Sequence, residues 1–313
     1  MTGAEQPMAD EDDIPRDERL AVDADLVRKL VAEQFPQWAD LPVLPVAVNG
    51  WDNSTFHLGD SMKVRLPMAA GYVSQTAKEV HWLPLLAPQL PQPIPAPIAV
   101  GQPGHGYPLQ WSVYGWLAGE TAARERIGDL VVFADDLADF LLALERIEPL
   151  DAPLAGKHNF YRGGRLAVYD AETRDCVAAL GDRVSGAAAL ALWDAALATA
   201  WSRPPVWVHG DIAWGNLLVQ DGRLAAVIDF GSAAIGDPAC DLVISWTLFE
   251  GVSRERFRAR MGMDSGTWAR GRAWGLWKAL LVMRGHVEAG NMAGAEDERR
   301  LIETILGDQL PFD

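Results

Sequence analysis

Two short apolar segments that end in polar turns constrain this chain more than any other feature of its sequence. Residues 206–219 read Val-Trp-Val-His-Gly-Asp-Ile-Ala-Trp-Gly-Asn-Leu-Leu-Val, and residues 226–231 read Ala-Val-Ile-Asp-Phe-Gly. The apolar runs predict short strands at 206–208, 217–220 and 225–228. Asp211, Asn216 and Asp229 are therefore expected on two turns beside these strands. An ordinary pair of β-turns is the alternative, because Asp, Asn and Gly favour turns anyway.

The three polar side chains suit phosphoryl transfer. A carboxylate can accept or orient the attacking hydroxyl, and hard oxygen ligands can hold Mg²⁺, which neutralises charge on the β- and γ-phosphates. Asp-x-x-x-x-Asn followed by Asp-Phe-Gly is the spacing found in kinases. It predicts Asp211 as the catalytic base, with Asn216 and Asp229 as the metal ligands. Because no other residue is an evident activated nucleophile, direct transfer without a phosphoenzyme is expected.

Hydrophobic periodicity predicts an α+β chain in three parts. Residues 1–23 are polar and acidic and are expected to be a disordered tail. Residues 24–117 are expected to form a small domain whose strands fall within 43–48, 49–59, 62–66, 98–100 and 109–113, with helices at 25–35 and 74–86. Residues 118–313 are expected to be mainly helical, at 130–147, 172–180, 187–201, 238–249, 254–261, 264–286 and 294–307.

Charge and composition exclude several classes of partner. The net charge of −16 argues against nucleic-acid binding, which needs clustered Lys and Arg. No apolar run approaches the roughly 20 residues that span a bilayer, and the two cysteines show no metal or redox spacing, so a cytoplasmic monomer or homodimer is expected. Residues 118–230 hold 17 acids against 10 bases, which suits a cationic ligand but equally a surface kept acidic for solubility.

Three motifs together resemble the aminoglycoside phosphotransferase family. They are His209-Gly-Asp-Ile-Ala-Trp-Gly-Asn216, Ile228-Asp-Phe-Gly231 and Gly236-Asp-Pro-Ala-Cys-Asp-Leu242. The resemblance extends from about residue 40 to the C-terminus. It implies a bilobal protein-kinase-like fold, shared with choline and homoserine kinases, with a small antiparallel-sheet N-lobe at 24–117 and a larger, mainly helical C-lobe at 118–313. It also implies an ATP- or GTP-dependent transfer of the γ-phosphate, with Mg²⁺, to a small-molecule hydroxyl.

The resemblance implies roles for residues of the N-lobe. A cationic side chain on the third strand should contact the α- and β-phosphates and pair with a Glu on the next helix, which here is Glu79. Arg65 fits that position best, and Lys63 is the second candidate because residues two apart face the same side of a strand. Arg in place of Lys preserves phosphate pairing. A plain surface carboxylate is the alternative role for Glu79.

Two further backbone segments are implied to bind nucleotide. Asn49-Gly-Trp-Asp-Asn-Ser-Thr55 stands where the family has its phosphate-covering loop, so its backbone N–H groups and the hydroxyls of Ser54 and Thr55 are expected to hold phosphate oxygens. A plain hairpin is the alternative. Adenine is expected to hydrogen-bond main-chain groups from Gly115 to Leu117. His209 and Asp241 are expected to brace the catalytic loop rather than to react.

The acceptor is the least constrained part of the interpretation. An aminoglycoside-like antibiotic is preferred because of the acidic middle segment, and an amino alcohol, a sugar or a macrolide is the alternative. Trp214, Trp246, Trp268, Trp274 and Trp277 are expected mainly in the core, although an aromatic wall for a sugar or macrolide is also open. A kinase-like binding protein without turnover and a metal-dependent hydrolase are the alternatives from other classes.

Overall fold

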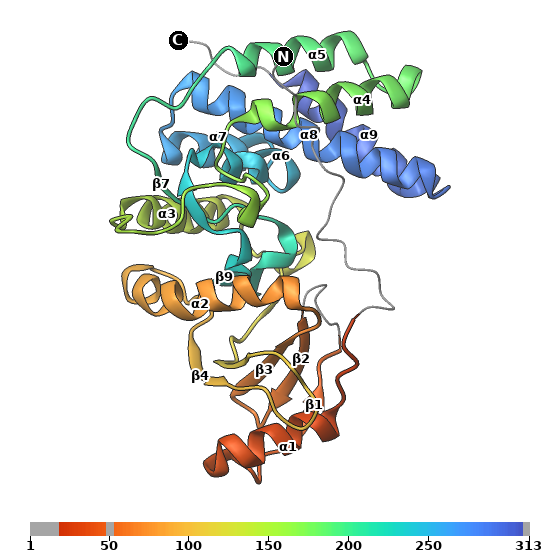
Figure 1. Cartoon of the computed structure of the whole chain (residues 1–313). Coiled ribbons are helices and arrows are strands. Elements are labelled where there is room, and N and C mark those ends of the chain that lie inside the picture. The colour runs from red at the N-terminus through yellow and green to blue at the C-terminus, as the bar shows by residue number, and fades with distance from the viewer. Residues whose placement is uncertain (1–18, 48–52, 309–313) are drawn as a thin grey trace. The chain divides into compact units, whose positions relative to one another are not determined.

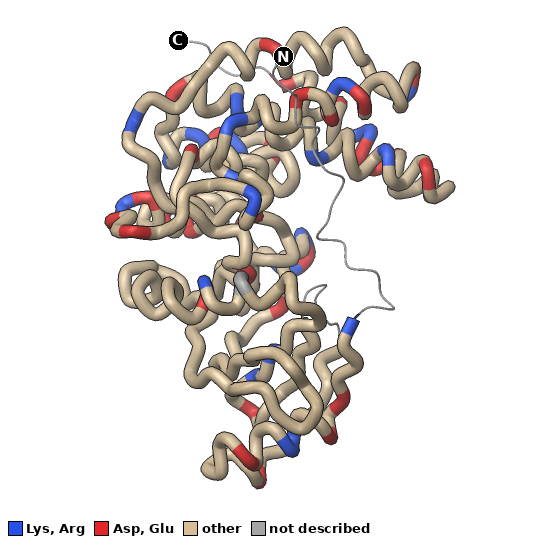
Figure 2. Tube along the Cα trace, in the orientation of Figure 1, with Lys and Arg blue, Asp and Glu red and all other residues tan. Residues whose placement is uncertain are grey.

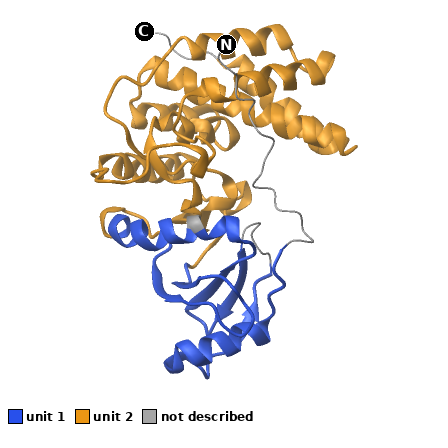
Figure 3. Cartoon of the chain, viewed as in Figure 1, with its two compact units in different colours: residues 1–87, 95–117 blue, residues 88–94, 118–313 orange. Residues whose placement is uncertain are grey.

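The computed structural model describes residues 19–47 and 53–308, except for the side chains of residues 74 and 75. The chain divides into two compact units, one of residues 1–87 and 95–117 and one of residues 88–94 and 118–313 (Figures 1 and 3). The expected disordered tail up to residue 18 and the expected turn at 49–52 lie outside the described residues.

The first unit is a five-stranded antiparallel sheet with two α-helices (Figure 1). Its strands follow the spatial order β1-β2-β3-β5-β4, so that β5 lies between β3 and β4. The strands are β1 (Val43–Pro45), β2 (Asn53–Leu58), β3 (Met62–Pro67), β4 (Pro97–Gly101) and β5 (Trp111–Gly115), and the helices are α1 (Ala24–Gln34) and α2 (Val73–Leu86). The antiparallel sheet predicted from the sequence is confirmed.

The two faces of this sheet have different roles. Phe56 and Leu58 of β2 share a core with Val27 and Leu30 of α1. Register pairs Phe56 with Val64 and Thr55 with Arg65, so successive residues alternate between that core and the opposite face. The opposite face therefore carries Thr55 and His57 of β2 and Lys63 and Arg65 of β3.

The second unit is mainly helical, as expected, with two small antiparallel sheets (Figure 1). One sheet has the order β6-β8-β9 and the other pairs β7 with β10. The strands are β6 (Glu120–Thr121), β7 (Val206–Val208), β8 (Leu217–Gln220), β9 (Arg223–Val227) and β10 (Ala234–Gly236). The helices are α3 (Leu130–Arg146), α4 (Asp170–Leu180), α5 (Gly186–Leu197), α6 (Ile244–Thr247), α7 (Gly251–Met261), α8 (Ser265–Glu288) and α9 (Met292–Gly307).

The largest difference from the sequence prediction lies at 238–249. The structure has a 3₁₀ helix, Pro238–Val243, followed by the single turn α6, where one continuous helix was expected. Asp237 caps this segment, since its carboxylate accepts a hydrogen bond from the Ala239 N–H at 3.1 Å. The same carboxylate pairs with Arg270, whose Nε lies 2.6 Å from Asp237 Oδ2.

Aromatic side chains fill the core of the second unit. Trp193 of α5 and Trp274 and Trp277 of α8 belong to one buried cluster. Trp246 and Trp268 are also buried, at 3% and 7% exposure. The expectation of core packing is confirmed for Trp246, Trp268, Trp274 and Trp277, whereas Trp214 is half-buried. Cys176 and Cys240 are buried free thiols.

Some acidic residues of the middle segment are paired with arginines of the same unit. Asp135 and Asp139 of α3 bind Arg256 and Arg260 of α7 at 2.8 and 2.7 Å. Figure 2 shows acidic and basic residues next to one another in the region where Figure 1 labels α3. Among the described residues, no helix is both long and apolar enough to cross a membrane.

Candidate functional site

Two backbone contacts join the segments that carry Asp211, Asn216 and Asp229. The Ile228 N–H donates a hydrogen bond to the Asn216 carbonyl at 2.8 Å. Because Asp229 follows Ile228 directly, this hydrogen bond holds Asp229 close to Asn216. The His209 ring, fully buried, has Nε2 at 3.0 Å from the Ile228 carbonyl oxygen and Nδ1 at 3.2 Å from the Asp211 backbone nitrogen. The structure thus brings the three predicted residues together on one hydrogen-bonded frame.

Gly210 and Asp241 fix the loop that begins this frame. Asp241 accepts hydrogen bonds from the backbone N–H groups of His209 and Gly210, both at 2.7 Å. Gly210 has φ +83°, and a Cβ there would lie 2.6 Å from the Ser232 carbonyl oxygen, so a larger residue would displace the loop. Burial raises the pKa of Asp241, while His209 and the two N–H groups oppose that rise. These contacts agree with the bracing role predicted for His209 and Asp241.

Both carboxylate oxygens of Asp211 have partners. Oδ1 accepts a hydrogen bond from Lys278 Nζ at 2.8 Å, and Oδ2 accepts one from Asn216 Nδ2 at 3.2 Å. Burial alone would raise the pKa of Asp211, but the Lys278 ammonium outweighs it, with help from Arg162 and His209, and the pKa lies below its ordinary value. Asp211 is therefore an ionised carboxylate fixed in direction, as a group that orients a hydroxyl must be.

Asn216 and Asp229 fit the metal chemistry predicted for them. The Asn216 amide nitrogen donates to the Asp211 carbonyl at 2.9 Å and to its carboxylate, which leaves the amide oxygen, the atom that ligates Mg²⁺, for another partner. Asp229 is exposed and has φ +67°, an uncommon backbone conformation for a residue other than glycine. No three His, Cys, Asp or Glu side chains of the described residues form a metal cluster. A pair of oxygen ligands is nevertheless typical of Mg²⁺, which takes its other ligands from phosphates and water.

In the first unit, Arg65 and Glu79 form the ion pair that the sequence predicted. Arg65 Nη1 lies 2.9 Å from Glu79 Oε2, and the Glu79 side chain is 5% exposed. The Tyr114 hydroxyl donates to the same oxygen at 2.7 Å, and burial followed by the Glu79 charge raises the pKa of Tyr114. Lys63 Nζ lies 6.0 Å from the centre of the Tyr114 ring, on the same face of the sheet.

The other residues expected to bind nucleotide lie at separate places in the first unit. Ser54 is buried and pairs with Leu66 of the core, so its side chain faces away from Arg65. Thr55 pairs with Arg65 and lies on the same face as Arg65. Gly115 ends β5 opposite Met62, and Leu117 follows two residues later. The alternation of β2 thus places the Thr55 side chain, and not that of Ser54, on the face that carries Arg65.

The sequence did not point to four residues near Asp211. Lys278 contacts Asp211, and Arg162 lies 4.8 Å from the centre of the Trp277 ring. That ring stacks on Tyr169 at 4.1 Å between centroids, and its Nε1 donates to Glu172 at 2.6 Å. Sequence spacing gives no signal for such contacts, although Lys278 is the one lysine of α8.

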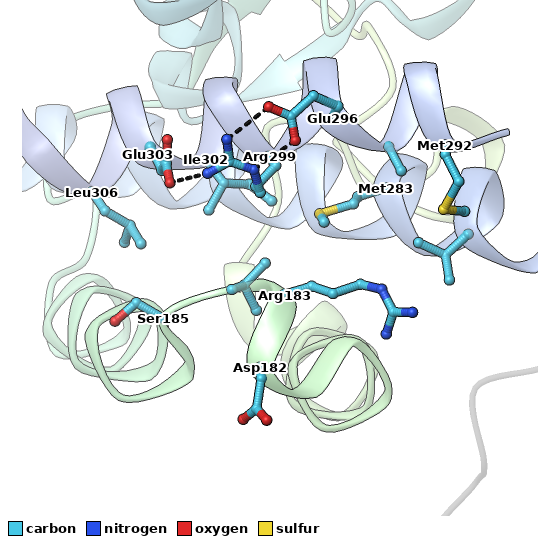
Figure 4. A pocket seen from close by; sticks show the side chains of 13 residues that line it. Asp182, Arg183, Ser185, Met283, Met292, Glu296, Arg299, Ile302, Glu303 and Leu306 are labelled. Carbon is cyan, nitrogen blue, oxygen red and sulfur yellow. Dashed lines mark hydrogen bonds and ion pairs between the residues drawn. The ribbon is translucent and has the colours of Figure 1, made fainter.

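A cavity of about 650 Å³ lies elsewhere in the second unit, where the α4–α5 connection faces α8 and α9 (Figure 4). Met283 and Met292 contribute to its apolar lining, and Arg299 lies between Glu296 and Glu303 at its edge. Its lining, drawn from the described residues, includes none of the predicted site residues. The residues predicted for phosphoryl transfer in the second unit therefore lie on the Asp211 frame and not in the lining of this cavity.

Comparisons with known proteins agree with this geometry. Residues 43–274 match the profile of the Phosphotransferase enzyme family. An aminoglycoside 3'-phosphotransferase from Escherichia coli is 39% identical over 62 residues, which are 19% of this chain and 23% of that protein. The match thus spans about a quarter of the length of this relative.

Solved structures with the same fold include two classes of antibiotic phosphotransferase. The GDP complex of aminoglycoside 2'-phosphotransferase-IIIa has a TM-score of 0.66 at 17% identity and covers 91% of this chain and 99% of its own. Macrolide 2'-phosphotransferase from Brachybacterium faecium has a TM-score of 0.56 at 20% identity and covers 89% and 97%. A thermostable aminoglycoside phosphotransferase bound to AMP-PNP and hygromycin B has a TM-score of 0.62 at 20% identity and covers 90% and 97%. With three quarters of its length matched by the profile, the chain belongs to the Phosphotransferase enzyme family.

Proposed function

We propose that this protein transfers the γ-phosphate of ATP or GTP to a hydroxyl of a small molecule. The observation that carries the proposal is the single hydrogen-bonded frame that joins Asp211, Asn216 and Asp229. In it an ionised carboxylate adjoins two oxygen ligands suited to Mg²⁺. Phosphoryl transfer requires little beyond positioning and charge neutralisation, and these residues supply both.

The chemical step uses Asp211 as acceptor of the hydroxyl proton. The acceptor oxygen forms a bond to the γ-phosphorus while the bond from that phosphorus to the bridging oxygen of the nucleotide breaks, and the nucleoside diphosphate leaves with that electron pair. Asp211 orients the hydroxyl and takes its proton. Asn216 and Asp229 hold Mg²⁺, which neutralises phosphate charge when bound.

Residues of the first unit bind the nucleotide in this proposal. Arg65, held by Glu79, contacts the α- and β-phosphates, and Lys63 is the second candidate for that contact. The Thr55 hydroxyl and the backbone from Gly115 to Leu117 provide the remaining contacts, for phosphate and base respectively. Complexes of related structures with GDP, ADP or AMP-PNP support a nucleotide as co-substrate.

An aminoglycoside-like antibiotic is the proposed acceptor. The support comes from relatives, since similar structures are complexes with kanamycin, gentamicin or hygromycin B. A macrolide is the second candidate, because a similar structure is a macrolide 2'-phosphotransferase and the cations Lys278 and Arg162 lie near Asp211. Asp135 and Asp139 are paired with arginines, so the acidic charge of the middle segment gives less support to a polycationic ligand.

A nucleotide-coupled turnover screen over aminoglycosides, macrolides, amino alcohols and sugars tests the proposal. Turnover is expected with ATP or GTP, is lost when Mg²⁺ is chelated, and yields a phosphate ester of one acceptor class. Asp229→Ala should weaken Mg²⁺–nucleotide binding in a calorimetric titration. Nucleotide binding without transfer to any acceptor would favour a kinase-like binding protein, and ester hydrolysis without nucleotide would favour a hydrolase.

A further inference from the structure

The catalytic loop carries no cation of its own. Residues 209–219 contain Asp211 and Asn216 but neither Lys nor Arg. The γ-phosphoryl group spreads negative charge over three oxygens during transfer, and this charge needs positive partners in addition to a metal ion. A cation beside Asp211 must therefore come from another element of the fold.

Helix α8 brings such a cation to the loop. Lys278 Nζ lies 2.8 Å from Asp211 Oδ1, although the two residues are 67 positions apart. Lys278 follows Trp274 by four residues, so both lie on the same side of the helix, where Trp274 is 1% exposed. The side chain thus leaves the buried face of α8 and ends at the carboxylate.

The segment of α8 that leads to Lys278 is anchored at two positions. Arg270 forms a buried pair with Asp237, with side-chain exposures of 6% and 10%. Trp277, adjacent to Lys278, donates to Glu172 of α4 at 2.6 Å. With the helix fixed in this way, the ammonium position depends only on the four-carbon side chain, which can follow a neighbouring oxygen.

The exposure of the Lys278–Asp211 pair points to more than a stabilising contact. Its side chains are 40% and 34% exposed, and ion pairs of this exposure contribute about 0–1 kcal/mol to stability. A hydroxyl that hydrogen-bonds to Asp211 and attacks phosphorus would bring phosphoryl oxygens close to the same carboxylate. The ammonium then lies within reach of those oxygens.

We propose that Lys278 is a catalytic residue that contacts the transferred phosphoryl group and neutralises its charge. In the absence of ligands it pairs with Asp211, and as the hydroxyl docks on Asp211 it shifts to a phosphoryl oxygen. No proton leaves Lys278, and the hydroxyl proton still goes to Asp211. The role rests on the proposed phosphoryl transfer and adds to it a cation supplied by a distant helix.

Steady-state kinetics of Lys278→Met test the proposal, with Arg284→Met as the control that removes a cation from the same helix. Lys278→Met should lower kcat about 10²-fold, the typical loss for one electrostatic group, with the KM values nearly unchanged. Lys278→Arg should restore much of the rate because it keeps the charge. Arg284→Met, which loses an exposed pair with Glu288 and a contact with Cys176, should behave as wild type.

A second variant separates phosphate contact from support of Asp211. Adding Lys278→Met to Asp211→Ala should lower the remaining rate again, measured as transfer or as slow nucleotide hydrolysis by water. An unchanged rate in the double variant, or wild-type kcat in Lys278→Met, would overturn the role of Lys278 alone. Absence of both transfer and hydrolysis in the wild type would overturn the proposed function and this role together.

Discussion

Glu79 is a buried carboxylate whose charge depends on two neighbours of different kinds. Arg65 supplies a full positive charge at 2.9 Å, and the Tyr114 hydroxyl adds a neutral hydrogen bond at 2.7 Å. Because the carboxylate is 5% exposed, water cannot replace a lost partner. The proposed phosphate contact and the stability of the first unit therefore both depend on the Arg65 guanidinium.

Replacing Arg65 should therefore weaken nucleotide binding. A charged hydrogen bond is worth about 1.5–3 kcal/mol, so Arg65→Met should raise the nucleotide dissociation constant roughly 10- to 100-fold. Isothermal titration calorimetry measures this dissociation constant. Arg65→Lys should lose less nucleotide affinity than Arg65→Met, because it retains the charge. Lys63→Met is the matched control, and a larger loss there than in Arg65→Met would transfer the phosphate contact to Lys63.

Glu145 of α3 is a partly buried carboxyl that the proposed reaction does not use. Burial raises its pKa to about 8, with the carboxylates of Asp241 and Asp237 adding to the rise and Arg146 and Arg203 opposing it. The folded protein therefore holds a proton on Glu145 at pH values where the unfolded chain has released it. Stability from this group is present below the unfolded pKa of about 4.5 and is lost as the pH rises towards 8.

Glu145→Gln should remove this pH dependence. The difference in free energy of unfolding between variant and wild type should grow in favour of the variant between pH 5 and pH 8, because the amide remains neutral. Urea unfolding of both proteins at several pH values measures this difference in free energy of unfolding. A difference that stays constant across that range would show that Glu145 is ionised in the folded protein throughout.

Single residues also show where sequence reasoning succeeds. Asp211, Asn216 and Asp229 could be located from spacing because each lies on a turn whose flanking strands are short and apolar. Lys278 could not be located from the sequence, because its contact with Asp211 depends on how α8 packs on the loop. A single lysine in a helix also gives no periodic pattern. The sequence could not show which of Ser54 and Thr55 lies on the Arg65 face, because the polar sequence before β2 does not fix where the strand starts and hence how its faces alternate.

At the scale of elements, α8 connects the catalytic frame to the rest of the second unit. Its Arg270 reaches Asp237, the residue that caps the 3₁₀ helix bearing Asp241. Gly271 permits this approach, because a Cβ there would lie 2.9 Å from the Ala239 carbonyl oxygen. The helix thus holds both Lys278 and, through Asp237, the segment that braces the loop.

Breaking the Arg270–Asp237 pair should destabilise the fold far more than breaking a surface pair. Arg270→Met leaves a buried carboxylate without its cation, which typically costs about 3–5 kcal/mol. Arg260→Met, which removes an ion pair with both side chains 45% exposed, should cost about 0–1 kcal/mol. Denaturant unfolding compares the two, and equal losses would contradict the anchoring role given to Arg270.

Long amphipathic helices were the elements best predicted from sequence. The apolar period of α3 located it to within a residue, because its buried residues recur on one face. The segment 238–249 departed from expectation, and within and beside it Asp241 binds the backbone of Gly210 and Asp237 binds Arg270, contacts that the sequence does not show. The strands β6 and β10 were missed, since two and three residues carry too little pattern.

For the whole molecule, the acidic charge has a local explanation. Part of the excess in the middle segment is neutralised along α3 by arginines of α7 and β9. The sequence shows the excess but not this pairing, because the partners lie 87 to 121 residues away. Net charge therefore says less about the acceptor than the side chains around Asp211 do.

The most direct test of the account follows a labelled γ-phosphate from nucleotide to acceptor with wild-type protein and with Asp211→Asn. The wild type should place the label on the acceptor hydroxyl and none on the protein. Asp211→Asn should slow transfer by roughly 10²-fold or more, because the amide cannot take the hydroxyl proton, while nucleotide affinity is preserved. Transfer by Asp211→Asn at near the wild-type rate, or label bound covalently to the protein, would contradict the account.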